Sequence, residues 1–123
     1  MSTHSQVVYE NGKWDGKTVR EWLPVVVDEI VREFDPVKVI VFGSLARGDE
    51  GPDSDLDLLV VFDHLDDKER SSLMGSVRMA VTAPVPCDIV VTDIAECERR
   101  KDVIGSMHYW PMREGKVVYE RAA

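Results

Sequence analysis

The stretch from Val37 to Phe62, VKVIVFGSLARGDEGPDSDLDLLVVF, predicts the centre of the fold. Its first part, Val37–Phe42, is β-branched and apolar, which is typical of a buried strand. A Gly-Ser turn, a short helical turn over 45–47 and a loop over 48–54 rich in Gly, Pro and Asp follow. Asp55–Phe62 is a second predicted strand. Because its LLVVF end has no polar alternation, we expect both of its faces to be covered.

The segments on either side of this stretch predict further helices and strands. Thr18 and Glu21 have capping-box spacing, and Pro24 suits a loose first turn before a secure helix. The expected elements are a helix over 23–34, a helix over 66–83, a strand over 87–91, a helix over 92–99 and a strand over 117–119. Together they predict an α/β (α+β) fold with a small mixed β-sheet of about four strands packed with helices. Residues 1–17 are expected to form an N-terminal arm, and residues 18–123 the domain.

Composition and charge limit the classes of function. At 123 residues and 44% hydrophobic content, the chain fits one soluble domain. Its net charge of −8 argues against binding long nucleic acid, which needs a basic surface. No apolar run reaches the roughly 20 residues of a membrane helix, and the N-terminus lacks a signal-peptide pattern, so we expect a cytoplasmic protein that does not bind membranes. Cys87 and Cys97 form no metal-binding pattern and are expected to be reduced.

Gly43 and Ser44 form the first candidate binding element. Glycine after a buried strand allows a sharp turn and close approach of a ligand. The backbone N–H groups from Ser44 to Ala46 would be free at the start of a helical turn, where they can bind an anion. Arg47, one turn later, could offer its guanidinium to the same anion. A Gly-Ser turn by itself is usually only a turn, so the assignment depends on neighbouring residues.

Asp55 and Asp57 supply that context. In a strand, residues i and i+2 point to the same face, so both carboxylates would lie together at the strand start. Like charges in that position repel each other unless a cation lies between them, and Mg²⁺ favours carboxylates and phosphates as ligands. The alternative is that Asp55 caps the loop and Asp57 faces solvent. The LLVVF segment directly after Asp57 favours the metal site, because a carboxylate at the mouth of a buried strand is costly.

Asp88 is a third candidate, within the predicted strand CDIVV. It could be a strand-start residue bonded to a turn. If its strand lies beside the strand of Asp57, it would instead join the metal cluster and help to deprotonate an attacking hydroxyl group.

In this order, Gly43-Ser44, Asp55-x-Asp57 and Asp88 resemble the motifs of the DNA polymerase beta-like nucleotidyltransferase superfamily. The fuller run GSLARG…SDLDLLV, with CDIVV and the ending REGKVVYE, is similar to the minimal nucleotidyltransferase (MNT) domains. The resemblance extends over most of the chain from residue 37 onward. It implies the nucleotidyltransferase fold, with a small mixed sheet and helices.

The resemblance also implies roles for individual residues. Ser44 and the adjacent backbone would hold the β and γ phosphates of a nucleoside triphosphate, usually ATP. Asp55 and Asp57 would bind two Mg²⁺ ions, and Asp88 the ion at the acceptor. An acceptor hydroxyl would attack the α-phosphorus and expel pyrophosphate. Arg47 would contact phosphate or only brace the loop.

Many short members of the family act with a helical HEPN partner as the antitoxin of a toxin–antitoxin pair. The resemblance therefore implies transfer of AMP to a hydroxyl group, on a HEPN-type partner protein or within a homodimer. Two alternatives remain open. One is a non-catalytic antitoxin that neutralises its partner by occlusion, and the other is a nucleotidyltransferase for a small molecule such as an antibiotic.

Several other residues have ordinary roles as their first interpretation. His4, His64 and His108 are isolated and are expected on the surface or in loops. The segment containing Tyr109, Trp110 and Met112 predicts a hydrophobic plug over the sheet, with contact to adenine or a partner as the alternative. The basic run at 99–101 is expected to be a solvated helix end.

Overall fold

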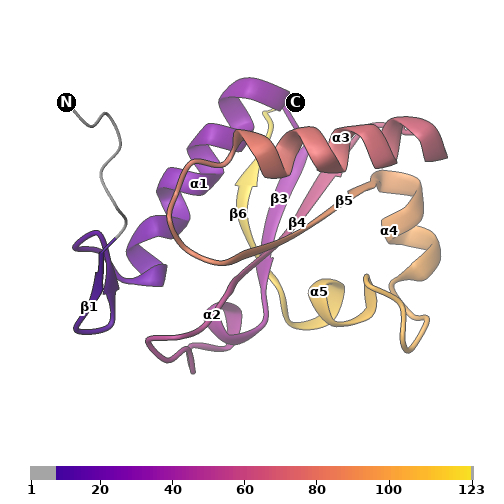
Figure 1. The fold of residues 1–123 in the computed structure, drawn as a ribbon. Coiled ribbons are helices and arrows are strands. Elements are labelled where there is room, and N and C mark those ends of the chain that lie inside the picture. Colours follow the sequence, from indigo (N-terminus) through magenta and orange to yellow (C-terminus); the bar gives the residue numbers. More distant parts are fainter. Residues whose placement is uncertain (1–7, 123) are drawn as a thin grey trace.

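The central sheet has four strands in the order β5-β4-β3-β6 (Figure 1). In this computed structural model, which describes residues 8–122, the strands are β3 (Lys38–Phe42), β4 (Leu56–Phe62), β5 (Cys87–Asp93) and β6 (Lys116–Glu120). β3 pairs antiparallel with β4 and β6, whereas β4 and β5 are parallel. The predicted mixed sheet with helices is confirmed.

One face of the sheet packs against α1 (Val19–Phe34) and α3 (Asp67–Ala80). The Thr18–Glu21 capping box is present, with Glu21 N donating to Thr18 Oγ1 at 3.2 Å and Thr18 N to Glu21 Oε1 at 2.8 Å. This cap starts α1 earlier than expected and places Pro24 inside the helix. No helix in the described part of the chain is long and apolar enough to cross a membrane.

α3 begins with a second capping box, between Asp66 and Glu69. It ends at Ala80, three residues before the expected end, because Val81 is extended and the Thr82 N–H turns away to Glu29. This helix provides the crossover that two parallel strands require between them. The main core lies between both helices and the sheet and includes Val26, Ile30, Leu58, Val60 and Val77.

The opposite face of the sheet carries α4 (Ile94–Arg100) and α5 (Tyr109–Glu114). A smaller core on this face comprises Ile40, Leu59, Val61, Val90 and Cys97. The helix predicted over 92–99 begins two residues later than expected, at Ile94. Thr92 is buried in β5, and Asp93 caps α4 by accepting the Glu96 N–H at 2.8 Å. Cys87 and Cys97 are free, as expected.

The described part of the predicted arm forms a hairpin of β1 (Tyr9–Glu10) and β2 (Lys13–Trp14). The Trp22 indole donates to the Trp14 carbonyl at 2.8 Å, and the Tyr9 hydroxyl donates to Asp53 at 2.9 Å. The hairpin is therefore tied to α1 and to the loop that precedes the catalytic candidates. Residues 1–7 lie outside the described residues.

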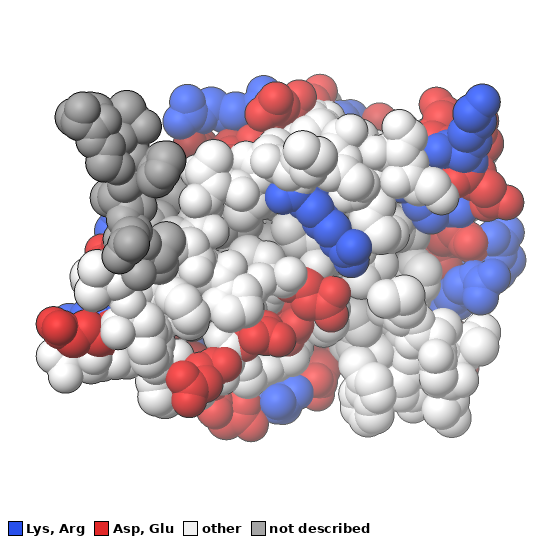
Figure 2. Space-filling model, viewed as in Figure 1, with Lys and Arg blue, Asp and Glu red and all other residues white. Residues whose placement is uncertain are grey.

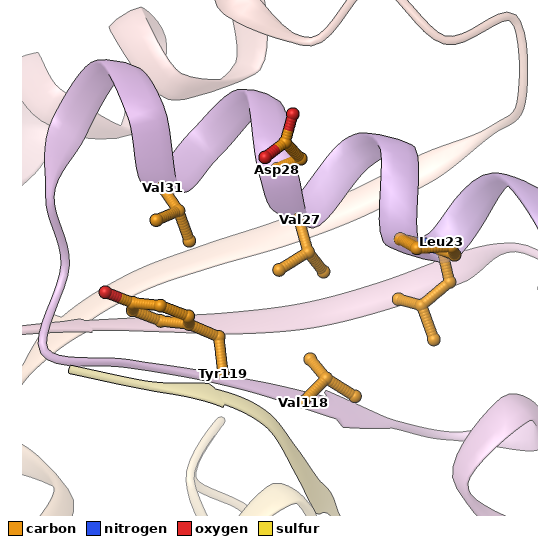
Figure 3. Close-up of a pocket in the computed structure, with 7 residues that line it drawn as sticks. Leu23, Val27, Asp28, Val31, Val118 and Tyr119 are labelled. Carbon is orange, nitrogen blue, oxygen red and sulfur yellow. The ribbon is translucent and has the colours of Figure 1, made fainter. Parts of the chain in front are cut away.

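β6 is an edge strand with an irregular register. Val39 pairs with Tyr119 and Ile40 with Val117, so Val118 is an extra residue in β6. Such a bulge bends its strand. Val118 and Tyr119 both point toward α1 and line an apolar groove of about 420 Å³ (Figure 3).

Candidate active site

The parallel pairing of β4 and β5 places Asp57 directly beside Asp88. On its other side, Asp57 is paired with Phe42, the last residue of β3. Asp55 was expected within the strand, but β4 begins at Leu56, and Asp55 immediately precedes it. The end of β3 and the starts of β4 and β5 therefore meet at one edge of the sheet. All three carboxylates occupy this edge.

The environment of Asp57 is unfavourable to its own charge. Burial, together with the nearby charges of Asp88 and Asp55, raises the pKa of the Asp57 carboxyl to about 6, while Arg47 acts in the opposite direction. Three neighbouring carboxylates supply the kind of oxygen ligand that suits a hard divalent cation such as Mg²⁺. Among residues 8–122, no group of three His, Cys, Asp or Glu side chains is close enough together to hold a metal ion.

Gly43 forms the turn between β3 and the next helical turn, and it touches the carboxylate of Asp57. Its φ of 71° and ψ of −148° lie in a region that is essentially restricted to glycine. A Cβ atom at this position would lie 2.3 Å from Oδ2 of Asp57. Only glycine therefore allows the turn and the carboxylate to lie this close together.

The turn continues into α2 (Ser44–Arg47). Leu45 and Ala46 are buried and anchor it to the core, while Ser44 is half-buried. Arg47 N donates to the Gly43 carbonyl at 3.1 Å, and this is the first backbone hydrogen bond of the turn. The N–H groups of the three residues before Arg47 therefore have no partner within the turn. These N–H groups and the Ser44 hydroxyl are suited to bind phosphate oxygens.

Arg47 connects α2 with α5. Its Nε donates to Asp49 at 3.1 Å and its Nη1 to Glu114 at 3.0 Å. Its Nη2 makes no hydrogen bond to any residue that the structure describes. Arg47 thus braces α2 against α5, and its Nη2 group remains available to bind a ligand.

A cavity of about 390 Å³ opens between these elements. It is lined by Phe42, Gly43, Arg47, Asp57, Trp110 and Glu114. The cavity joins the Gly-Ser turn and the central carboxylate to the exposed indole of Trp110. No sequence motif marked Glu114 as a residue of the site.

The segment containing Tyr109, Trp110 and Met112 has residues that fit each of the two predicted roles, a plug over the sheet and a contact surface. Met112 packs against the smaller core as a plug. Trp110 is 59% exposed and contacts Tyr109 edge to face, with ring centroids 5.0 Å apart. Its indole thus remains available to a base or to a partner.

His108 lies in the turn before α5, in agreement with the expected loop position, but it is not on the surface. Its ring is buried, and its Nε2 lies 2.7 Å from the Thr92 hydroxyl. Burial lowers the pKa of the His108 imidazole, which favours the neutral form. His64 is exposed, as expected, and His4 lies outside the described residues. Residues 99–101 form a solvated helix end, whose side chains pair with Glu96 and Glu98.

Comparisons with known proteins identify the family and the fold. The family model described as "Nucleotidyltransferase domain" matches residues 24–109. A solved structure from Sulfolobus solfataricus, assigned as a nucleotidyltransferase, is 24% identical and covers 84% of this chain and 81% of its own, with a TM-score of 0.62. The likeness shows a shared fold.

Two toxin–antitoxin structures have lower scores. One contains AMP-PNP, is 20% identical and covers 79% of this chain and 73% of its own, with a TM-score of 0.45. The other, a variant MntA–HpeT complex, is 18% identical and covers 80% and 72%, also with a TM-score of 0.45. No protein of curated function matches the sequence.

Proposed function

Because the chain belongs to the nucleotidyltransferase domain family, we propose that it transfers AMP from ATP, with Mg²⁺, to a hydroxyl group of a partner protein. The observation that carries the proposal is the pairing of Asp57 with Asp88 across β4 and β5. Two adjacent carboxylates, one of them with its pKa raised to about 6, are poorly accommodated without a cation. Family membership and this charge arrangement support the same chemistry.

Each candidate residue has a role in the proposed reaction. Asp55 and Asp57 would hold two Mg²⁺ ions, and Asp88 the ion nearer the acceptor. Bound Mg²⁺ would neutralise phosphate charge and lower the barrier to transfer. The turn at Gly43 and Ser44 would hold the β and γ phosphates through backbone N–H groups. The free Nη2 of Arg47 would reach the same phosphates.

The proposed transfer exchanges one phosphorus–oxygen bond for another. The acceptor oxygen forms a bond to the α-phosphorus, and the bond between that phosphorus and the bridging oxygen breaks. The electron pair leaves with pyrophosphate. Asp88 would take the hydroxyl proton, and its place beside Asp57 at the same sheet edge supports this role.

The acceptor that we propose is a HEPN-type partner in a toxin–antitoxin pair. Its support is the resemblance of the motifs to MNT domains. An enzyme acting on a small hydroxyl compound and a binder that works by occlusion are the competing functions, and they predict different products.

The test is co-expression with the product of the adjacent gene, followed by intact-mass measurement of both chains with ATP and Mg²⁺. We expect the partner to gain the mass of AMP, and to lose this gain with Asp55→Asn or Asp57→Asn. Asp63→Asn, an exposed carboxylate just beyond the far end of β4, is the matched control and should retain transfer. Full transfer by either site variant would contradict the proposal. Protection without any mass gain would favour occlusion.

A further inference from the structure

A patch of apolar side chains lies exposed between α4 and α5. We call it the apolar patch; it consists of Val103 (48% exposed), Ile104 (81%), Met107 (61%) and Trp110 (59%). Single exposed apolar residues are ordinary, but several large ones within a short segment mark an interaction site.

The segment that carries the apolar patch is held in a defined conformation. Successive backbone bonds run from Val103 N to the Arg100 carbonyl at 3.0 Å and from Ser106 N to the Val103 carbonyl at 3.1 Å. The Ser106 hydroxyl also donates to the Arg100 carbonyl at 3.0 Å. His108 anchors the segment to Thr92 in β5. A patch held in place before binding loses less entropy when a partner docks.

The apolar patch is continuous with the candidate active site through Trp110. The same indole lines the cavity that contains Asp57 and Arg47. In Figure 2, an uncharged lobe lies at the part of the surface where Figure 1 shows the connection between α4 and α5, and acidic side chains gather beside it on the same face. A molecule docked on the lobe would therefore stand next to the catalytic candidates.

The charges around the apolar patch indicate the chemistry of its partner. Lys101 pairs with Glu98 at 2.7 Å, and Arg113 pairs with Asp102 at 2.9 Å. Arg99 and Arg100 share the carboxylate of Glu96, so the α4 side of the patch is not acidic. Its acidic side is the cavity beyond Trp110, which Asp57 and Glu114 line. The chain as a whole carries a net charge of −8. A nucleic acid would be repelled, whereas a protein with an apolar face and a basic rim would fit both the patch and its surroundings.

We propose that the apolar patch is the docking surface for the acceptor of AMP transfer, a folded protein that presents an apolar face, a basic rim and a reactive hydroxyl side chain. This inference rests on the proposed function and assigns it a recognition surface. Trp110 would stand at the boundary between the docked protein and the nucleotide.

The experiment uses the double variant Ile104→Ser/Met107→Ser, which changes the two most exposed residues of the patch. The matched control is Met79→Ser, since Met79 is 88% exposed on α3, outside the patch. Each full chain is incubated with ATP labelled at the α-phosphate, Mg²⁺ and a protein extract of the source cells. Label in protein is measured after gel separation, and ATP affinity is measured by calorimetry.

We expect the double variant to lower protein labelling by about tenfold or more, which corresponds to about 1.4 kcal/mol, because truncating two side chains of a docking surface removes part of its binding energy. Its ATP affinity should stay within about twofold of that of the unmodified chain, and the Met79 variant should label normally. The labelled protein should bind a cation exchanger at neutral pH.

Three results would overturn the inference. The first is equal labelling by the double variant. The second is an acidic acceptor. The third is a concentration-dependent dimer of the unmodified chain that the double variant abolishes, which would assign the patch to a second copy. Absence of labelling by the unmodified chain would instead refute the proposed function, and the docking surface with it.

Discussion

Gly43 and Asp57 are in such close contact that a Cβ atom added to Gly43 would lie 2.3 Å from Oδ2 of Asp57. Gly43 directly follows Phe42, the last residue of β3, and Phe42 pairs with Asp57 in the β3–β4 register. The phosphate turn and the central carboxylate are thus one structural unit, and a change in either should disturb both.

Gly43→Ala should impair both stability and catalysis. The backbone strain at φ 71° costs on the order of 1–3 kcal/mol, and the new methyl group would displace Asp57. Gly48→Ala is the matched control, because Gly48 also has a positive φ, of 80°, but an added Cβ meets nothing within 4 Å. Urea unfolding and AMP transfer should show that only the Gly43 variant loses transfer, by about 100-fold or more. Equal transfer by both variants would contradict the contact.

Asp57→Asn should stabilise the protein at neutral pH without metal. The Asp57 pKa rises from 3.8 in the unfolded chain to about 6 in the folded protein, so between these values the folded state binds more protons. Stability attributable to this group therefore falls as pH rises from about 4 to about 6, and the loss persists above that range.

Thermal unfolding in EDTA at pH 4 and pH 7.5 measures this effect. The Asn variant should exceed the unmodified chain in Tm at pH 7.5 and match it near pH 4. A Tm difference that is the same at both pH values would refute the assignment.

Divalent cations should reverse this order of stability. A ligand that binds only the folded state raises stability by about 2.7 kcal/mol at 100 times its Kd. Mg²⁺ or Mn²⁺ should raise the Tm of the unmodified chain at pH 7.5, and EDTA should restore the original value. The Asp57→Asn variant should respond much less. An equal response would place the cation elsewhere.

Glu114→Gln should separate the two roles considered for Arg47. The amide removes the negative charge and weakens the bond from Nη1 of Arg47, now 3.0 Å from Glu114, so that the guanidinium can turn toward phosphate. ATP affinity measured by calorimetry should hold or improve with this variant, and should fall about tenfold with Arg47→Gln. If both variants weaken ATP binding equally, Arg47 only braces α2 against α5.

Thr92→Val should lower stability by about 1–3 kcal/mol, because it leaves the buried Nε2 of His108 without its partner at 2.7 Å. The double variant Thr92→Val/His108→Leu should recover part of this loss, since both polar groups are then removed. Urea unfolding of the single and double variants measures the coupling. Additive losses would show that the two side chains do not depend on each other.

The sequence contained enough information to predict the sheet and to expect Asp57 beside Asp88. Runs such as VKVIVF and LLVVF identify buried strands from their composition alone. A parallel pairing of β4 with β5 then follows from the intervening helix, and the strand starts must lie at one edge.

Other features depend on contacts that local patterns do not encode. Thr92 and Asp93 are both good caps, and only burial of the Thr92–His108 pair in the fold decides that Asp93 begins α4. The N-terminal hairpin gains its support from Tyr9 bonding to Asp53, 44 residues away. The salt bridge between Arg47 and Glu114 joins residues 67 positions apart, so local sequence patterns could not predict it either.

The position of β6 has a consequence for biosynthesis. β3 pairs with β6, and just after β6 Arg121 N donates to the Val37 carbonyl at 2.8 Å. The Arg121 side chain also donates to the carbonyl of Asp35, 86 residues earlier in the chain. While the ribosome is still making the chain, β3 therefore has one open edge and lacks half of its hydrogen-bonding partners. Nascent chains stalled before β6 should be sensitive to proteases and prone to pairing with other strands, because the sheet is complete only once β6 has left the ribosome.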